Sequence, residues 1–167
     1  MSNQTQTNLP RVYVETTIVS YLTSRPSKNP VVAGHQKTTQ DWWDGDRSDF
    51  ELFTSQLVLQ EAGEGDQTAA LERLAVLNTF PVLDTTDQAL LLAEELLRAK
   101  ALPTKAADDA LHIAVAATQR IPYLLTWNCR HMANATMRPV IETVCATFGL
   151  KAPIICTPEE LRRTPRE

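Results

Sequence analysis

The stretch that decides the fold is KAADDALHIAVAA, residues 105–117. It opens on two adjacent carboxylates, Asp108 and Asp109, and then becomes almost wholly apolar. This pattern predicts a helix that begins at a functional site and continues into the core. The helical period places Asp109 on one face with His112 and turns Asp108 away, so we expect one acid to bind a ligand and the other to cap the helix. Within its apolar run, His112 is more typical of a packed core histidine than of a ligand.

Short runs of β-branched and aromatic residues predict strands around this helix. The predicted strands are residues 11–15, 50–54, 80–83, 123–126 and 154–156. Helical patterns lie between them at residues 16–22, 31–44, 55–61, 68–79, 88–100 and 139–148, with a terminal helical turn at 158–163. We expect Thr16 or Thr17 to cap the first helix. Strands that alternate with helices imply crossover connections, and therefore an α/β fold with a parallel central sheet between layers of helices.

The composition is that of an ordinary globular protein. The chain has 167 residues, of which 43% are hydrophobic. Because no repeat or linker interrupts it, we expect a single domain over residues 10–167, preceded by a flexible polar segment at residues 1–9. The formal net charge of −4 argues against a protein that coats nucleic acid or a membrane surface, although a local basic strip can still hold a polyanion.

Cysteine usage and hydropathy indicate the compartment. The cysteines Cys129, Cys145 and Cys156 are widely spaced and match no zinc or disulfide framework, which favours reduced thiols. No apolar run reaches the roughly 18 residues of a membrane helix, and the polar start MSNQTQTN lacks the apolar region of a signal peptide. We therefore expect a cytoplasmic protein without a membrane partner.

Acidic side chains gather where the predicted strands end. Glu15 ends the first predicted strand, Asn128 lies just past the fourth, Glu61 lies on the helix after the second strand, and Asp108 and Asp109 open the long helix. Ligands bind at the carboxyl edge of a parallel sheet, so we expect these groups to converge there. Two carboxylates about 4 Å apart repel by about 4 kcal/mol at an effective dielectric near 20, so the cluster must raise its pKa values or bind a cation. Oxygen ligands suit Mg²⁺ or Mn²⁺, which can activate water against a phosphodiester.

Each of these residues also has a simpler interpretation. Glu15 can be a solvated residue at a strand end, and Glu61 lies close to the surface acids Glu64 and Asp66. His131, in a loop, is either a substrate contact or a surface residue. Trp127 is a candidate for stacking on a base next to the site. Five cations are either phosphate contacts or solvated surface residues: Arg25, Arg98, Lys100, Lys105 and Arg130.

Four ordered segments resemble those of a known family. They are YVETTIVSYL at residues 13–22, SQLVLQE at 55–61, DDALHIAVA at 108–116 and LLTWNCRHMAN at 124–134. Together they span most of the chain, which resembles PIN-domain ribonucleases of the VapC toxin type. The resemblance implies a PIN-like three-layer α/β/α fold and a Mg²⁺ or Mn²⁺ site that cleaves RNA. It also implies a toxin that is paired with an antitoxin protein and that forms a homodimer.

The resemblance assigns the acids of the site. The family's first acid corresponds to Glu15, where an aspartate is more usual, its second to Glu61 and its third to Asp109. Asp108 is left as an auxiliary neighbour. The fourth position, commonly an aspartate, falls on Asn128, whose neutral amide would weaken a second metal site more than the first.

Neighbouring residues complete the predicted site. Thr16 and Thr126 stand beside the acids and are expected to orient the carboxylates or a bound water through hydroxyl hydrogen bonds. Trp127, Arg130 and His131 are the predicted substrate contacts. The leading hypothesis is a metal-dependent endoribonuclease in which Glu15, Glu61 and Asp109 bind the metal and Asn128 assists.

Two rival hypotheses come from other classes of protein. The first is a non-catalytic PIN-like module that binds RNA or a protein partner, since Glu15 and Asn128 both depart from the commonest pattern. The second is a phosphoacceptor of the receiver type, because that fold also gathers acids at a sheet edge. The late position of Asp108 and Asp109 in the chain argues against the receiver.

Overall fold

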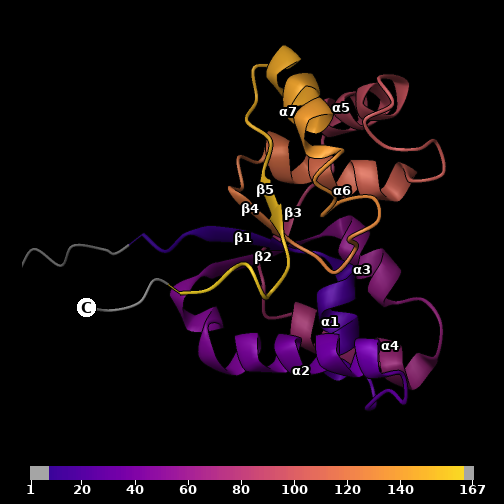
Figure 1. The fold of residues 1–167 in the computed structure, drawn as a ribbon, viewed down its shortest axis with the longest axis vertical. Helices are drawn as coiled ribbons and strands as arrows, with labels where there is room; N and C mark the ends of the chain where they lie inside the picture. The colour runs from indigo at the N-terminus through magenta and orange to yellow at the C-terminus, as the bar shows by residue number, and fades with distance from the viewer. Residues whose placement is uncertain (1–7, 164–167) are drawn as a thin grey trace, which may run out of the picture.

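A five-stranded parallel sheet forms the centre of the protein (Figure 1). The computed structural model describes residues 8–163, so the segment 1–7 of the predicted flexible N-terminus lies outside the described residues. The strands are β1 (Arg11–Val14), β2 (Glu51–Ser55), β3 (Val82–Leu83), β4 (Tyr123–Leu125) and β5 (Ile154–Cys156). They lie in the order β3-β2-β1-β4-β5, and every neighbouring pair is parallel. The predicted α/β fold is thus confirmed.

Helices cover both faces of the sheet. They are α1 (Thr16–Thr23), α2 (Pro30–Gly45), α3 (Gln56–Ala62), α4 (Gln67–Leu77), α5 (Asp87–Arg98), α6 (Ala107–Thr118) and α7 (Arg138–Thr147), with a short 3-10 helix, η1 (Arg47–Asp49). Helices α1 to α4 pack on one side, and α5 to α7 pack on the other (Figure 1). The architecture is therefore the predicted three-layer α/β/α arrangement.

Helix α6 joins the site to the core, as its sequence predicts. Ile113 and Val115 are fully buried within it, and α6 packs closely against α5, which contributes Leu92 and Leu96 to the core. The predicted capping role of Asp108 is wrong, because the cap position is Ala106 and makes no side-chain hydrogen bond. Asp108 and Asp109 both lie in the first turn, where their charge favours the helix dipole.

The predicted terminal helical turn at residues 158–163 forms only in its first part. A turn spans residues 158–160, and the Leu161 amide donates to the Thr157 carbonyl over 3.1 Å. The backbone beyond it bonds to other elements, since the Arg163 amide donates to Asp46 and the Leu161 carbonyl accepts from Trp42. These contacts hold the end of the described chain against α2.

The pairing of β1 with β4 places the site. Val14 pairs with Leu125, and the Glu15 amide donates to the Leu125 carbonyl over 3.1 Å. Because the strands are parallel, the residues that follow them, Glu15 and Thr126, come out side by side at the carboxyl edge. Within residues 8–163, no helix is long and apolar enough to cross a membrane.

The fold predicts different reactivity for the cysteines. Cys129 is exposed, whereas Cys145 and Cys156 are buried, and burial raises their thiol pKa values to about 11 and about 12. Because the thiolate is the reactive form, we expect iodoacetamide to modify Cys129 alone in the folded protein and the other two only after unfolding in guanidinium. Intact-mass spectrometry counts the adducts. Rapid modification of Cys145 or Cys156 without denaturant would contradict this packing.

Candidate metal centre

Glu15 is a buried carboxylate held at the junction of β1 and α1. Its side chain is only 4% exposed. Its Oε2 accepts hydrogen bonds from the Thr17 amide at 3.1 Å, from the Thr17 hydroxyl and from the Thr126 hydroxyl at 2.8 Å. Glu15, rather than Thr16 or Thr17, is therefore the cap of α1. The alternative of a solvated residue at a strand end is wrong for Glu15.

The buried environment of Glu15 favours a nearby positive charge. Burial raises its pKa, and the charge of His112 together with the hydrogen bonds from Thr17 and Thr126 opposes that rise only in part. A carboxylate removed from water in this way is stabilised by any cation brought within a few ångströms.

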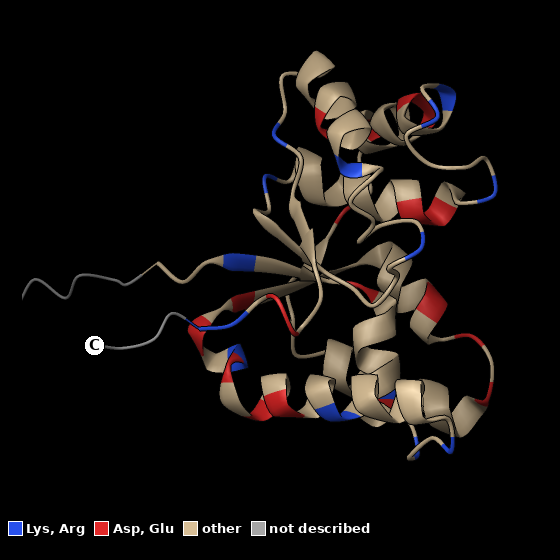
Figure 2. Cartoon of the chain, in the orientation of Figure 1, with Lys and Arg blue, Asp and Glu red and all other residues tan. Residues whose placement is uncertain are grey.

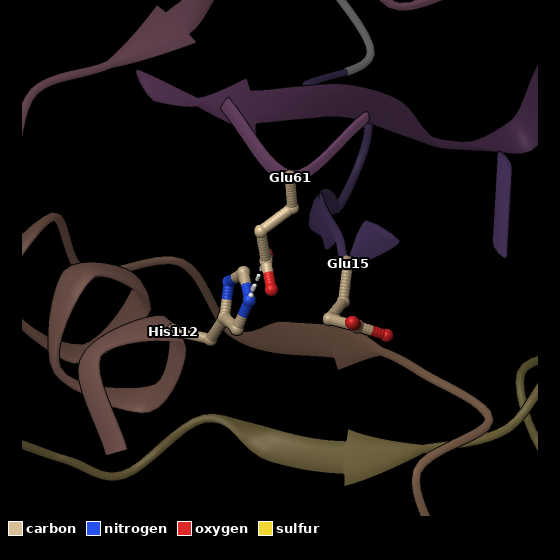
Figure 3. Close-up of side chains that lie close together, drawn as sticks. All are labelled: Glu15, Glu61 and His112. Carbon is tan, nitrogen blue, oxygen red and sulfur yellow. Dashed lines mark ion pairs between the residues drawn. The ribbon is translucent and has the colours of Figure 1, made fainter. Parts of the chain in front are cut away.

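Glu61 and His112 meet beside Glu15. Figure 3 shows His112 of α6 reaching Glu61 of α3, with Glu15 next to them at the end of β1. The Nε2 atom of His112 lies 2.6 Å from Oε1 of Glu61, and the Thr16 hydroxyl donates to the same oxygen over 2.8 Å. The ligand atoms of Glu15, Glu61 and His112 all lie within 4.8 Å of one another.

Glu61 and His112 shift each other's titration in opposite directions. Burial acts to raise the pKa of Glu61, but the hydrogen bond and charge of His112 outweigh it and lower that pKa. Burial likewise acts to lower the pKa of His112, but its hydrogen bond to the Glu61 carboxylate and the charges of Glu15, Glu61 and Asp109 raise that pKa. The acids thus favour the protonated imidazole, and the imidazole favours the ionised form of Glu61.

A buried hydroxyl pair fixes the far side of the His112 ring. The phenol of Tyr13 lies 2.6 Å from Nδ1 of His112 and 2.8 Å from the hydroxyl of Ser55. Burial raises the pKa of Tyr13 far above its usual range, so the phenol stays neutral. Ser55 also caps α3 through the Val58 amide, as its sequence position predicts. Tyr13 therefore holds Nδ1 of His112, while Nε2 faces the Glu61 carboxylate.

Asp109 belongs to a second arm of the site, which also includes Asn128 and His131. Its Oδ2 lies 3.0 Å from Nδ1 of His131, whose backbone amide donates to Oδ1 of Asn128 over 3.0 Å. The backbone amide of Asn128 in turn donates to the Thr126 hydroxyl over 2.9 Å. The side-chain oxygen of Asn128, which was predicted to assist a metal, is thus engaged in holding the loop. Asn128 thereby places His131 against Asp109.

The predicted stacking role of Trp127 is not supported by its position. The side chain is 8% exposed, and its indole nitrogen donates to the Thr39 hydroxyl over 2.7 Å. The ring stacks on His35, with 4.1 Å between centroids. Trp127 instead helps to build the site, because its backbone amide donates to the hydroxyl of Thr17.

The remaining predicted residues are on the surface. Asp108 and Arg130 are exposed, and neither makes a side-chain hydrogen bond or ion pair to another described residue. Sequence reasoning missed three residues that shape the centre, namely Tyr13, Thr17 and His112. For His112 a signal existed, because it follows Asp109 by one helical turn on the same face.

The donor set fits a hard divalent cation. Glu15 and Glu61 supply carboxylates from two elements, and Asp109 follows in the first turn of the helix that carries His112. Mg²⁺ and Mn²⁺ prefer oxygen ligands, and Mn²⁺ also accepts an imidazole. His112 is the nitrogen donor of this set, with its Nε2 2.6 Å from Glu61.

Solved structures show the same fold. The chain is similar to a Mycobacterium tuberculosis toxin, VapC20, described as cleaving the sarcin–ricin loop, with a TM-score of 0.51, 19% identity and coverage of 71% of this chain and 91% of that chain. It is also similar to VapBC2 from Rickettsia felis bound to a promoter DNA fragment, with a TM-score of 0.52, 14% identity and coverage of 88% of this chain and 98% of that chain. At these identities the likeness concerns the fold alone.

Sequence comparison gives the family. No curated protein sequence matches the chain. The model of the PIN domain matches residues 12–131, which run from the first strand to the loop that carries His131. Since this match covers well over half of the 167 residues, the chain belongs to the PIN domain family.

Proposed function

We propose that this PIN domain is a metal-dependent endoribonuclease that hydrolyses RNA phosphodiester bonds. The observation that carries the proposal is the convergence of Glu15, Glu61 and His112 within 4.8 Å at the carboxyl edge of the sheet, with Asp109 one helical turn from His112. Buried acids at this edge suit a hard cation, and such a cation suits phosphodiester hydrolysis. Membership of the PIN family and the fold shared with VapC20 support the same activity.

Glu15, Glu61 and Asp109 are the residues we assign to the metal, which is Mg²⁺ or Mn²⁺. When bound, the ion supplies Lewis acidity toward a phosphate oxygen and toward the attacking water. The surrounding residues position these acids: Thr17 and Thr126 hold Glu15, while Thr16 and His112 hold Glu61.

The second arm serves Asp109 and the substrate. His131 binds one oxygen of the Asp109 carboxylate, and among the described residues the other oxygen has no hydrogen-bond partner. His131 thereby restricts the rotation of a carboxylate that must face the metal. Asp108, which is exposed and unpaired, has no such constraint and is an auxiliary charge near the site.

The biological role follows from the same likeness. We infer a toxin that is neutralised by an antitoxin protein, since both similar structures are VapC-type proteins and one of them is a VapBC complex. We further propose that the chain acts in the cytoplasm as a homodimer and that residues 10–167 form one domain.

Replacement of Asp109 tests the reaction. We expect purified protein to cleave single-stranded RNA with Mg²⁺ or Mn²⁺ and to lose that activity in EDTA. Asp109→Asn removes a metal-binding charge and should lower kcat/KM by at least about 100-fold, judged from the 10- to 100-fold effects of residues that merely support metal ligands. Asp108→Asn is the matched control and should stay close to wild type. Because all variants are purified alike, cleavage that survives both chelator and Asp109→Asn contradicts the proposal.

Metal binding is tested separately from catalysis. An ion that binds only the folded state stabilises it by about 2.7 kcal/mol at a hundred times its Kd. We therefore expect millimolar Mn²⁺ to raise the Tm of the wild type and to have much less effect on Glu61→Gln. Glu64→Gln, which removes an exposed acid just beyond α3, should respond like the wild type. A wild-type Tm that does not change when Mn²⁺ is added would instead favour a non-catalytic module that binds RNA or protein.

A further inference from the structure

A groove lies beside the acidic centre, between the α5–α6 connection and the β4–α7 connection. Its volume is about 640 Å³. Leu97, Pro103 and Met137 supply partly exposed apolar surface above the buried Leu102, while Lys100, Lys105 and Arg130 supply positive charge. Figure 2 shows blue segments of these connections flanking the red first turn of α6. The groove therefore combines an apolar lining with a cationic one.

The three cations of this groove have no internal partners. Among the described residues, no carboxylate pairs with Lys100, Lys105 or Arg130, whereas Arg98 pairs with Glu95 and Lys37 with Asp41. A cation without an internal counter-charge attracts an external anion, particularly on a protein whose net charge is −4.

The position of Lys100 is fixed by the end of α5. Its φ of 57° lies in the left-handed region that commonly ends a helix. The amides of Lys100 and Ala101 donate back to the carbonyls of Leu97 and Leu96 over 3.1 and 2.9 Å. The backbone of Lys100 is thus held against the helix, so its side chain starts from a defined place at the groove.

The groove adjoins the residues around the metal centre through His131. His131 lines the groove and also lies 3.0 Å from Asp109 in the first turn of α6. One turn further along α6, His112 contacts Glu61. A polyanion lying in the groove would therefore pass beside the residue that contacts Asp109, with Arg130 next to His131 in sequence.

We propose that this groove binds the backbone of single-stranded RNA on one side of the scissile bond. This inference rests on the proposed ribonuclease function and names the part of the chain that holds its substrate. Lys100, Lys105 and Arg130 contact phosphates, and the apolar residues contact ribose and base faces, which a single strand exposes and a duplex hides. Because the recognition is through charge and apolar contact, the groove holds RNA with little dependence on sequence.

Two charge-matched variants test the groove. The groove variant is Lys100→Gln/Lys105→Gln/Arg130→Gln. The control variant, Lys28→Gln/Arg120→Gln/Lys151→Gln, removes the same charges from exposed cations outside the groove. Fluorescence anisotropy with a labelled single-stranded RNA in EDTA measures binding without cleavage. Thermal unfolding checks that both variants are folded.

We expect the groove variant to bind RNA at least about 10-fold more weakly than the wild type and the control to bind nearly normally. In single strands each lost phosphate contact lowers the slope of log K against log salt by about 0.7, so the groove variant should lose about 2 from its slope. Equal losses in the two variants, or no loss in the groove variant, would overturn the proposal. A duplex that binds as tightly as the single strand through the same cations would overturn it as well.

Binding in EDTA separates this proposal from the catalytic one. A wild type that binds RNA through the groove but cleaves none with Mn²⁺ would overturn the ribonuclease function and leave the groove assignment standing. A wild type that cleaves RNA while the groove variant binds and cleaves it equally well would overturn the groove alone.

Discussion

The buried carboxylate of Glu15 is the constraint on which the rest of the site depends. An isolated charge in a protein interior costs several kcal/mol, and that cost is tolerated only where donors or cations meet it. Glu15 receives its donors from the first turn of α1 and from the end of β4, two elements that are brought together by the β1–β4 register. The same register brings the loop after β4 to the sheet edge, so the arm of Asn128, His131 and Asp109 follows from it. The sheet order, the cap of α1 and the position of the loop therefore all serve to stabilise the buried carboxylate of Glu15.

Two histidines, His112 and His131, allow several acids to lie close together at one edge of the sheet. Glu61 is paired with His112, and Asp109 is paired with His131. Tyr13 holds the ring of His112, and the Asn128 side chain holds the backbone of His131 through its amide. Restraint of this kind fixes the carboxylates before any ligand arrives, which reduces the reorganisation needed when a cation or a phosphate enters. The residues that position these acids come from elements that are far apart in the chain.

Much of the fold could be predicted from the sequence, because strand and helix patterns are local. The β1, β2 and β4 segments, the Ser55 cap and the apolar face of α6 all follow from runs of a few residues. The site was only partly predictable. Glu15 and Glu61 converge as expected from their places after strands, whereas the partnership of Tyr13 with His112 joins residues 99 positions apart and leaves no local trace. Trp127 was misread for the same reason, since the His35 ring that covers it belongs to α2.

Net charge is a poor guide to a protein with this arrangement. The value of −4 describes the whole chain, yet an acidic centre that acts on RNA must bring phosphates close to carboxylates that repel them. A bound divalent cation offsets that repulsion only at the phosphate it touches, so the neighbouring phosphates need other positive charges. Cations placed among the acids would instead form internal ion pairs, as Arg98 does with Glu95. Unpaired lysine and arginine side chains just beyond His131 meet both conditions, because they are close enough to hold the strand and far enough from the acids to remain free.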